Sequence, residues 1–269
     1  MKGELASMRA YVEFAKKAFQ NNMVYRVDYV IGVLNTVISI FVYVAVWKAI
    51  YGSRVEIEGI SFNLVATNFI LGLAISNLFN FDDTMISSKV IDGTIATDLL
   101  KPISFNGYML FYNIGNVCFR TIIQFMPALI LAIIFIGIVP PYSIILFLFF
   151  LFSVFLSFLL LYHLSYIVSI LSFWFYNVWS ISTIKGVLIS LLSGTLMPMW
   201  FMPQGLVNFI KMTPFDSLFF IPISIYLGRI NSSGLIWGIA KQIIWITILF
   251  IISQILWKAA VKRLVVEGG

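Results

Sequence analysis

The sequence predicts an all-α polytopic membrane protein with six transmembrane helices, and three observations support this fold class. Of the 269 residues 61% are hydrophobic and only 10% are charged, whereas soluble domains usually contain about 25% charged residues. The apolar residues form long runs, and a helix needs only about 20 residues to cross a bilayer. Six such runs cover roughly 27–50, 62–82, 106–138, 142–170, 178–201 and 234–257. No linker separates them, so residues 1–269 are expected to form a single transmembrane domain.

Ahead of the first run, residues 1–26 are predicted to form a cytoplasmic amphipathic elbow helix. Over 3–20 apolar side chains recur at three- and four-residue steps, with charged side chains on another face. The apolar set is Leu5, Met8, Val12, Ala15 and Phe19, and the polar set is Arg9, Glu13, Lys16, Lys17 and Gln20. This pattern favours a helix in the membrane interface over a soluble helix that only leads into the membrane. With no signal peptide visible, the first run is expected to act as an uncleaved insertion signal.

The segment 203–229 is apolar overall but does not have the pattern of a spanning helix. Charges and helix breakers interrupt it, namely Lys211, Pro214, Asp216 and Pro222. Charges are costly within a membrane, and prolines break helices. We therefore expect two short helices that form a re-entrant hairpin on the outer side, after the fifth span.

Charge placement favours six spans over seven and puts both termini, with the tail 258–269, in the cytoplasm. Under this topology eleven of the 17 lysines and arginines lie inside and five lie outside, while Arg120 lies within the third run. A seventh span through 203–229 would place the three basic residues of the tail outside. The basic excess on the cytoplasmic side therefore follows the positive-inside rule.

The sequence contains none of the motifs that would make this chain an enzyme. It lacks a Gly-rich ATP-binding loop, a serine elbow and an HExxH zinc motif. Its single cysteine and single histidine, Cys118 and His163, are too few for a Cys/His zinc site. We expect no metal or cofactor in the chain itself. Asp82 and Asp83 could bind a cation, although a solvated helix end is the more ordinary interpretation.

Two ionisable residues lie inside the apolar runs, and each has two possible roles. His163 could relay protons, or it could hydrogen-bond across a helix interface. Arg120 could face a polar pathway, or its long side chain could extend to the inner headgroups.

Residues 83–105, between the second and third runs, are predicted to form a cytoplasmic loop that contains its own helix. Asp92 is a suitable residue to cap the start of this helix. The helix should end at about Lys101, because the residue before a proline, here Pro102, disfavours the helical region. We expect an apolar docking face of Ile91, Ile95, Ala96, Leu99 and Leu100, a polar face of Thr94, Thr97 and Asp98, and Gly93 in the first turn.

Six ordered motifs resemble those of permeases, the membrane subunits of ABC-2 type ATP-binding-cassette transporters. They are "DGTIATDLLKPIS" at 92–104, "SFWF" at 172–175, "LLSGTLMPMWFMP" at 191–203, "TPFDSLFFIPISIYLG" at 213–228, "KQIIW" at 241–245 and "AAVKRLVVEGG" at 259–269. The ordered set covers nearly the whole chain. It is most similar to a bacterial branch whose permeases are often encoded in pairs with one ATPase.

The resemblance implies a multi-pass permease of the bacterial plasma membrane with an elbow helix, six spans and an outer hairpin. It also implies partners: two cytoplasmic ATPase subunits that bind ATP and Mg, and a second permease chain, identical or related, but no nucleic acid. In this family a coupling helix in the first inner loop rests on the ATPase. The residues in that position are Asp92, Gly93, Thr94, Ile95, Asp98, Leu99, Leu100, Lys101 and Pro102.

The expected function is export of an amphipathic or hydrophobic substrate, driven by ATP hydrolysis on the partner ATPase. A path between the two permease chains would be lined by the second and fifth spans. The candidate residues are Asn68, Ser76, Asn77, Asn80, Ser190, Ser193 and Thr195, all of which could equally join helices. The alternative function is a stand-alone channel or ion-driven carrier, which would need ion sites deep in the spans.

Overall fold

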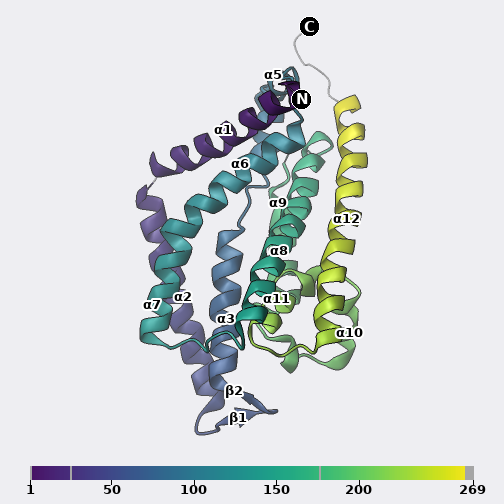
Figure 1. Ribbon diagram of the computed structural model, residues 1–269. Coiled ribbons are helices and arrows are strands. Elements are labelled where there is room, and N and C mark those ends of the chain that lie inside the picture. Colours follow the sequence, from purple (N-terminus) through teal and green to yellow (C-terminus); the bar gives the residue numbers. More distant parts are fainter. Residues whose placement is uncertain (1, 25, 176, 264–269) are drawn as a thin grey trace.

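The structure is a computed structural model that describes residues 2–24, 26–175 and 177–263, without the side chains of 2–7 and 26–29. The predicted end of the tail, 264–269, lies outside these residues, as does the side chain of Leu5. The described chain is almost entirely helical (Figure 1). Its α-helices are α1 (Lys2–Val24), α2 (Arg26–Tyr51), α3 (Phe62–Leu78), α4 (Met85–Ile91), α5 (Ile95–Leu99), α6 (Phe105–Arg120), α7 (Met126–Phe135), α8 (Ile144–Ile170), α9 (Trp179–Leu192), α10 (Gln204–Lys211), α11 (Phe220–Tyr226) and α12 (Ser232–Arg263). A short antiparallel hairpin joins β1 (Glu56–Ile57) to β2 (Ile60–Ser61).

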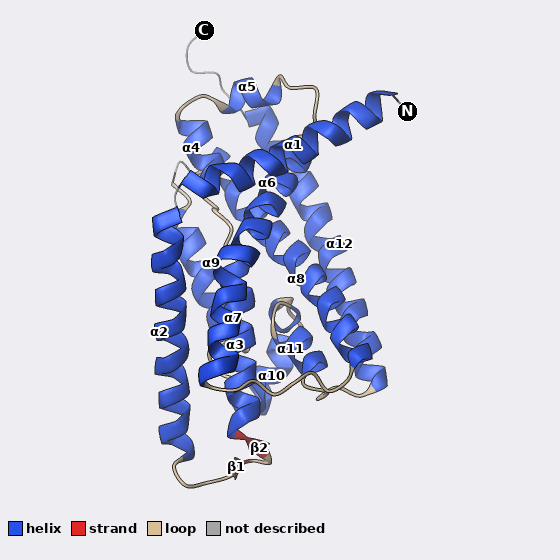
Figure 2. Ribbon diagram, turned by 60° about the vertical axis from the view of Figure 1, so that its left-hand side comes forward, coloured by secondary structure: helices blue, strands red, loops and turns tan. Residues whose placement is uncertain are grey.

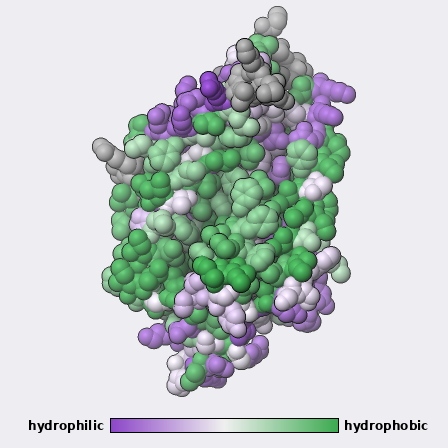
Figure 3. Space-filling model, viewed as in Figure 1, coloured by the Kyte–Doolittle hydropathy of each residue, from purple (hydrophilic) through white to green (hydrophobic). Residues whose placement is uncertain are grey.

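The long helices run side by side and give the molecule two distinct ends (Figure 1, Figure 2). One end contains α1, α4, α5 and the last turns of α12, and is called the α1 end below. The other contains the β-hairpin and α10, and is called the β end. On the face drawn in Figure 3, hydrophobic side chains form a broad band between the ends, and hydrophilic ones gather at both ends. This distribution is expected of a protein that crosses a membrane.

Four helical segments are long and apolar enough to cross a bilayer, namely Val30–Tyr51, Phe105–Phe135, Ile144–Phe173 and Ser232–Arg263. They correspond to the predicted first, third, fourth and sixth spans. The second and fifth are shorter, because α3 has 17 residues and α9 has 14. At 1.5 Å per residue α3 is about 25 Å long and α9 about 21 Å, against a hydrocarbon thickness of about 30 Å. The prediction of a mostly helical, multi-pass membrane protein is confirmed, whereas the count of six spans stays a prediction.

The predicted fifth span, 178–201, was too long. α9 ends at Leu192, and Gly194 adopts a left-handed conformation with φ +79°, which stops the helix. A Cβ at this position would also lie 3.3 Å from the Phe220 side chain of α11. The chain then turns and forms a short 3₁₀ helix at Met199–Phe201. The last third of the predicted span is therefore a compact turn.

The third predicted span is one helical segment with a π-helical turn, Thr121–Phe125, between α6 and α7. Pro127 stands at the start of α7 and has no N–H to complete the regular hydrogen-bond ladder, so a wider turn is accommodated there. The two halves run in different directions. α6 is inclined and lies along α1, whereas α7 runs beside α2 (Figure 1).

α1 packs closely across α6, so part of its apolar surface contacts the protein. A Cβ on Gly115 of α6 would lie 2.1 Å from the carbonyl oxygen of Ala15, and therefore only glycine fits at this crossing. Phe19 makes an edge-to-face contact with Phe119. Met8 and Val12, from the same predicted stripe, remain exposed. The predicted apolar face is thus divided between contact with α6 and an exposed strip.

The segment after α9 forms two short helices, α10 and α11, as predicted. Asp216 between them is buried and accepts a 2.5 Å hydrogen bond from Lys241 of α12. Gln242, the next residue of α12, donates to the Ser217 carbonyl at 2.9 Å and accepts from Ser153 of α8 at 2.9 Å. These bonds connect the hairpin to α8 and α12. They also explain how an apolar segment can hold an aspartate, since its charge is paired.

Candidate functional site

The loop between α3 and α6 protrudes at the α1 end and differs from the single capped helix that was predicted (Figure 1). It contains two helices, α4 and α5. Asp92 follows the last residue of α4 and does not cap the start of α5, so the prediction of an N-cap there was wrong. Gly93 has φ +71° and turns the chain between the helices. The carboxylate that does bind backbone at a helix start is Asp82, which accepts from the Thr84 N–H at 2.9 Å.

Ile95 anchors α5 to the body of the protein. Its side chain is 1% exposed and belongs to an apolar cluster at the α1 end. The cluster also contains Ile86 of α4, Phe105 and Met109 of α6, Tyr162, Tyr166 and Ile170 of α8, and Ala260 of α12. Leu99 is half-buried against the same cluster. Ile95 and Leu99 therefore face inward, as the predicted docking face required.

Asp98 is buried, although it was predicted to lie on the polar, exposed face. Lys89 of α4 and Lys101 each donate a 2.5 Å hydrogen bond to its carboxylate. Burial alone would raise the pKa of Asp98, but the hydrogen bonds from Lys101 and Lys89 outweigh it, and the pKa lies below its ordinary value. The pairing therefore stabilises the loop at neutral pH and is lost as the pH falls through this lowered pKa. The bond from Lys89 fixes α5 to α4, and the bond from Lys101 is local to the end of α5.

The exposed surface of the loop contains two large apolar side chains. Ile91 is 61% exposed and Leu100 is 85% exposed, so the prediction that they share one apolar face with the buried Ile95 was wrong. Thr94 and Thr97 are also exposed, in agreement with the predicted polar face. We call Ile91, Thr94, Thr97 and Leu100 the loop tip. Ile91 and Leu100 are thus large hydrophobic side chains exposed on the loop at the α1 end. Lys101 and Pro102 follow, close to the predicted helix end.

A buried ion pair lies at the base of this loop. Asp83, immediately before α4, is 1% exposed at its side chain, and its carboxylate oxygens lie 2.6 and 2.7 Å from Lys185 Nζ of α9. Ser182 of α9 donates to the same carboxylate at 2.5 Å, and Lys185 also donates to Ser165 of α8 at 2.8 Å. The interpretation of Asp83 as a solvated helix end was therefore wrong. The loop base is bonded directly to α8 and α9.

Sequence reasoning missed this ion pair, although one signal was present. Lys185 lies inside an apolar run, and a lysine in such a place needs a carboxylate partner. Asp83 is about a hundred residues away in the chain, and nothing in the local pattern connects the two. The pairing is a property of the tertiary fold.

The residues predicted to line a substrate path lie in three separate places. Asn68, Ser193 and Thr195 are buried together where α3 meets the turn after α9: Asn68 donates to the Gly194 carbonyl at 3.3 Å, and the two hydroxyls lie 2.7 Å apart. Asn77 donates to Thr36 of α2 at 3.0 Å, and the Asn80 carbonyl accepts from Arg120. Ser190 bonds within its own helix and Ser76 is half-buried. In this conformation several of these groups join helices.

His163 faces aromatic side chains in the middle of the bundle. Its ring makes edge-to-face contacts with Tyr162 and with Phe250 of α12. Its Nδ1 atom is buried and has no hydrogen-bond partner in the described chain, so the predicted bond across the helix interface is not made by this atom. Among the described residues no group of histidine, cysteine, aspartate or glutamate side chains could hold a metal ion.

The fold and the ordered motifs agree with one comparison with known proteins. A search of curated protein sequences found no match. A family model described as "ABC-2 family transporter protein" matches residues 34–268, which include five of the six predicted spans in full and the whole α3–α6 loop. Members of this family are typically non-catalytic membrane subunits. The chain therefore belongs to the ABC-2 family of transporter proteins, as a multi-pass membrane permease.

Proposed function

We propose that this chain is the permease subunit of an exporter in the bacterial plasma membrane, driven by ATP hydrolysis on a separate ATPase. Two ATPase subunits, which carry ATP and Mg, bind at the α1 end, which is cytoplasmic. A second permease chain, identical or related, completes the transport path. The observation that carries this proposal is the loop tip: exposed apolar side chains on a loop whose base is bonded into the bundle.

The loop is built to transmit a force from its tip to the spans. Leu100 and Ile91 are exposed to enter an apolar groove of the ATPase, while Ile95 fixes α5 to α6 and α8. The Lys89–Asp98 pair makes α4 and α5 move together. At the base, Asp83 is bonded to α9 through Lys185. Closure of the ATPase subunits would therefore displace α4, α5 and α9 as one unit, the kind of rigid-body change that switches a two-state domain.

The proposed membrane topology has six spans. α3 and α9 run alongside the four long helices (Figure 2) and cross the membrane together with the segments that extend them. α1 is the elbow helix, with Met8 and Val12 exposed to lipid, and α10 and α11 form the re-entrant hairpin on the outer side. An amphipathic or hydrophobic substrate would pass between the two permease chains along α3 and α9.

The proposal is tested by placing a charge in the loop tip. Leu100→Asp should reduce ATPase binding about tenfold or more, because about 1.4 kcal/mol of lost contact energy corresponds to tenfold. Substrate-stimulated ATPase activity in the reconstituted complex should fall with it. The matched control is Val55→Asp, because Val55 is 82% exposed in the β-hairpin region at the opposite end. The proposal fails if the Leu100 variant binds and stimulates the ATPase as the unaltered chain does, or if the Val55 variant has the larger effect.

The same preparation separates the exporter from the alternative function. A channel or ion-driven carrier would give substrate or ion flux from the permease alone, without nucleotide. The exporter requires ATP and the ATPase subunits, and the isolated permease should give no flux.

A further inference from the structure

Arg120 carries a positive charge that the described part of the chain does not balance. The other two cations that lie deep in apolar segments each have a carboxylate: Lys185 pairs with Asp83 at 2.6 Å and Lys241 with Asp216 at 2.5 Å. Arg120 donates to the backbone carbonyl of Asn80, and no carboxylate of the described side chains pairs with it. A guanidinium has five N–H donors, so most of its hydrogen-bonding capacity is left for another partner. Unpaired charge in a low-dielectric region is costly.

Arg120 lies where the end of α6 meets the end of α3. It is the last residue of α6, one turn beyond Asn116, which accepts a 2.8 Å hydrogen bond from Asn22 close to the end of α1. Asn80, its carbonyl partner, follows the last turn of α3 and precedes the protruding loop. The guanidinium is thus held beside the end of α3, on the side of the protruding loop.

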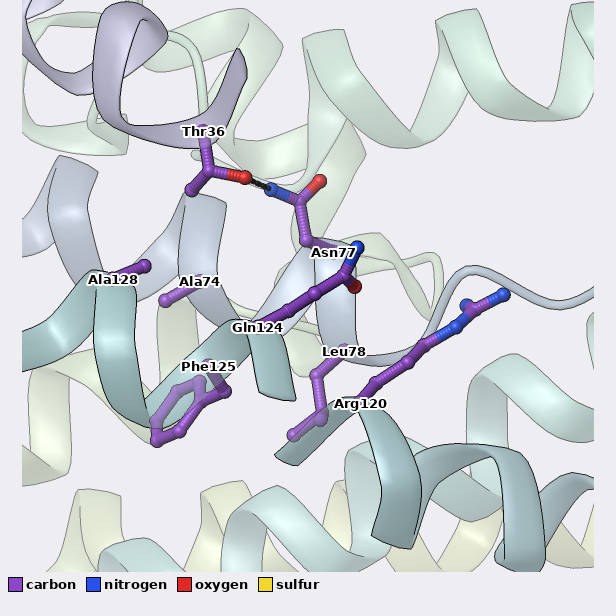
Figure 4. Close-up of a pocket in the computed structure, with 8 residues that line it drawn as sticks. All are labelled: Thr36, Ala74, Asn77, Leu78, Arg120, Gln124, Phe125 and Ala128. Atoms are coloured by element: carbon purple, nitrogen blue, oxygen red, sulfur yellow. Dashed lines mark hydrogen bonds between the residues drawn. The ribbon is translucent and has the colours of Figure 1, made fainter. Parts of the chain in front are cut away.

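Polar side chains from three helical elements surround a small pocket beside Arg120 (Figure 4). Asn77 of α3 donates to Thr36 of α2 at 3.0 Å. Gln124 comes from the π-helical turn, and its amide end lies beside Asn77 in the figure. A Cβ on Gly32 of α2 would lie 2.5 Å from the Gln124 amide nitrogen, so the glycine makes room for this side chain. Thr36, Asn77 and Gln124 therefore line the pocket together with Arg120, whose guanidinium extends away from Asn77 in the figure.

The surroundings of the pocket are suited to lipid tails. Leu78, Phe125 and Ala128 form its apolar wall. Ile122 and Ile123, which flank it on the π-helical turn, are exposed, and so is Leu34 on α2. A ligand with an anionic head and long apolar chains would match the arginine and the Gln124 amide with its head and the exposed isoleucines with its tails.

We propose that Arg120, together with Gln124, binds the phosphate group of a membrane phospholipid in the leaflet at the α1 end. The guanidinium can donate two parallel hydrogen bonds to phosphate oxygens, and the Gln124 amide can donate to a remaining oxygen. The acyl chains lie along α2 and the π-helical turn. A lipid in this position contacts α2, α3 and α6 at once and stabilises their arrangement. The site is independent of the loop tip and of ATPase binding.

The test measures binding of defined lipids to the delipidated full-length chain in mild detergent, by native mass spectrometry and by the shift of Tm. The probes are phosphatidylglycerol, diacylglycerol with the same acyl chains but no phosphate, and glycerol phosphate without acyl chains. The variants are Arg120→Gln, Arg120→Lys, which keeps the charge but loses the fork, and Gln124→Leu, which leaves Arg120 intact. Lys17→Gln, an exposed cation on α1, is the matched control for general attraction of anionic lipid.

We expect phosphatidylglycerol to bind the unaltered chain and the Lys17 variant equally, and the Arg120→Gln variant about tenfold more weakly. Arg120→Lys and Gln124→Leu should give intermediate losses, and these two variants decide the question if Arg120→Gln does not fold. Equal binding of phosphatidylglycerol by the Arg120, Gln124 and unaltered chains would overturn the proposal. If diacylglycerol binds as tightly as phosphatidylglycerol, the role of the phosphate is overturned. If glycerol phosphate binds as tightly as phosphatidylglycerol, the assignment to a lipid is overturned.

Discussion

Two buried lysine–aspartate pairs lie near opposite ends of the bundle, and their surroundings differ. Asp216 and Lys241 at the β end belong to a dense network that also includes Gln242 and ties the hairpin to α8 and α12. Asp83 and Lys185 at the α1 end join the base of a protruding loop to α9, with two serines as the further partners. The first pair joins the hairpin to the bundle, whereas the second joins a protruding loop to a span. Under the proposed function, the first pair would serve stability and the second would also serve transmission.

The largest expected effect is on stability, at the β end. Lys241→Met leaves Asp216 buried without its cation, and removal of one partner of a buried ion pair costs about 3–5 kcal/mol. The free energy of unfolding in mild detergent should fall by this amount. Coupling of ATPase activity to substrate should remain in the protein that still folds. A variant that folds as stably as the unaltered chain would show that the pair contributes little to the hairpin contact.

The second effect should separate coupling from stability at the α1 end. Asp83→Asn leaves Lys185 without its carboxylate partner. This long side chain is partly exposed and can reach solvent, so the cost in unfolding free energy is smaller than for Lys241→Met, about 2 kcal/mol. Transport per folded molecule should nevertheless fall more than in the Lys241 variant. The double variant that exchanges the two charges, Asp83→Lys with Lys185→Asp, should recover part of the lost transport. Loss of stability without any loss of transport would contradict the distinction between the two pairs.

A matched pair of serine substitutions sharpens the comparison. Ser182 donates to Asp83 at 2.5 Å, whereas Ser217 donates to Asp216 at 3.2 Å. A hydrogen bond to a charged group is worth about 1.5–3 kcal/mol, and a long one is worth less. Ser182→Ala should therefore lower the unfolding free energy by about 1.5 kcal/mol and Ser217→Ala by about 0.5 kcal/mol. Denaturant unfolding of the two variants measures both losses in unfolding free energy. A larger loss for Ser217→Ala than for Ser182→Ala would be inconsistent with these contacts.

The smallest effect is expected in the loop itself. Asp98→Asn removes the charge that holds Lys89 and Lys101, both of which can move into solvent, so the loss in global stability should stay within about 1 kcal/mol. Local opening of α5 should increase, and hydrogen exchange of its amides measures it. The unaltered loop should show the same increase only at acidic pH, below the ordinary range of a carboxyl pKa, because the pKa of Asp98 is lowered in the fold. An increase already at neutral pH would refute this pairing.

The spans and the hairpin could be predicted because their signals are local. α2 and α8 begin and end within two residues of the predicted runs, since their length and continuous apolar character leave few alternatives. The two helices of the hairpin followed from Pro214 and Pro222 in an otherwise apolar segment. The length of α9 was overestimated because Gly194 adopts a left-handed conformation just after a helix that composition alone would continue.

The faces of the loop could not be predicted, because they depend on contacts distant in sequence. A five-residue helix has too few turns for periodicity to fix its orientation. The orientation of α5 is decided by the left-handed turn at Gly93, by the pocket for Ile95 and by the lysine partners of Asp98. Leu100 was assigned by pattern to the same face as Ile95, but it is exposed in the fold whereas Ile95 is buried. Asp83 was assigned to solvent because its partner, Lys185, lies in another span.

The most direct test of the central claim is a crosslink between the loop tip and the ATPase. The free Cys118 is first replaced by serine, and then Leu100→Cys or Val55→Cys is introduced as the single thiol. A thiol-to-amine crosslinker is applied to membranes that contain the permease and its ATPase, and crosslinked peptides are identified by mass spectrometry. We predict crosslinks to an ATP-binding-cassette ATPase from position 100 and none from position 55. Crosslinks from position 55 alone would contradict both the proposed orientation and the role of the loop tip.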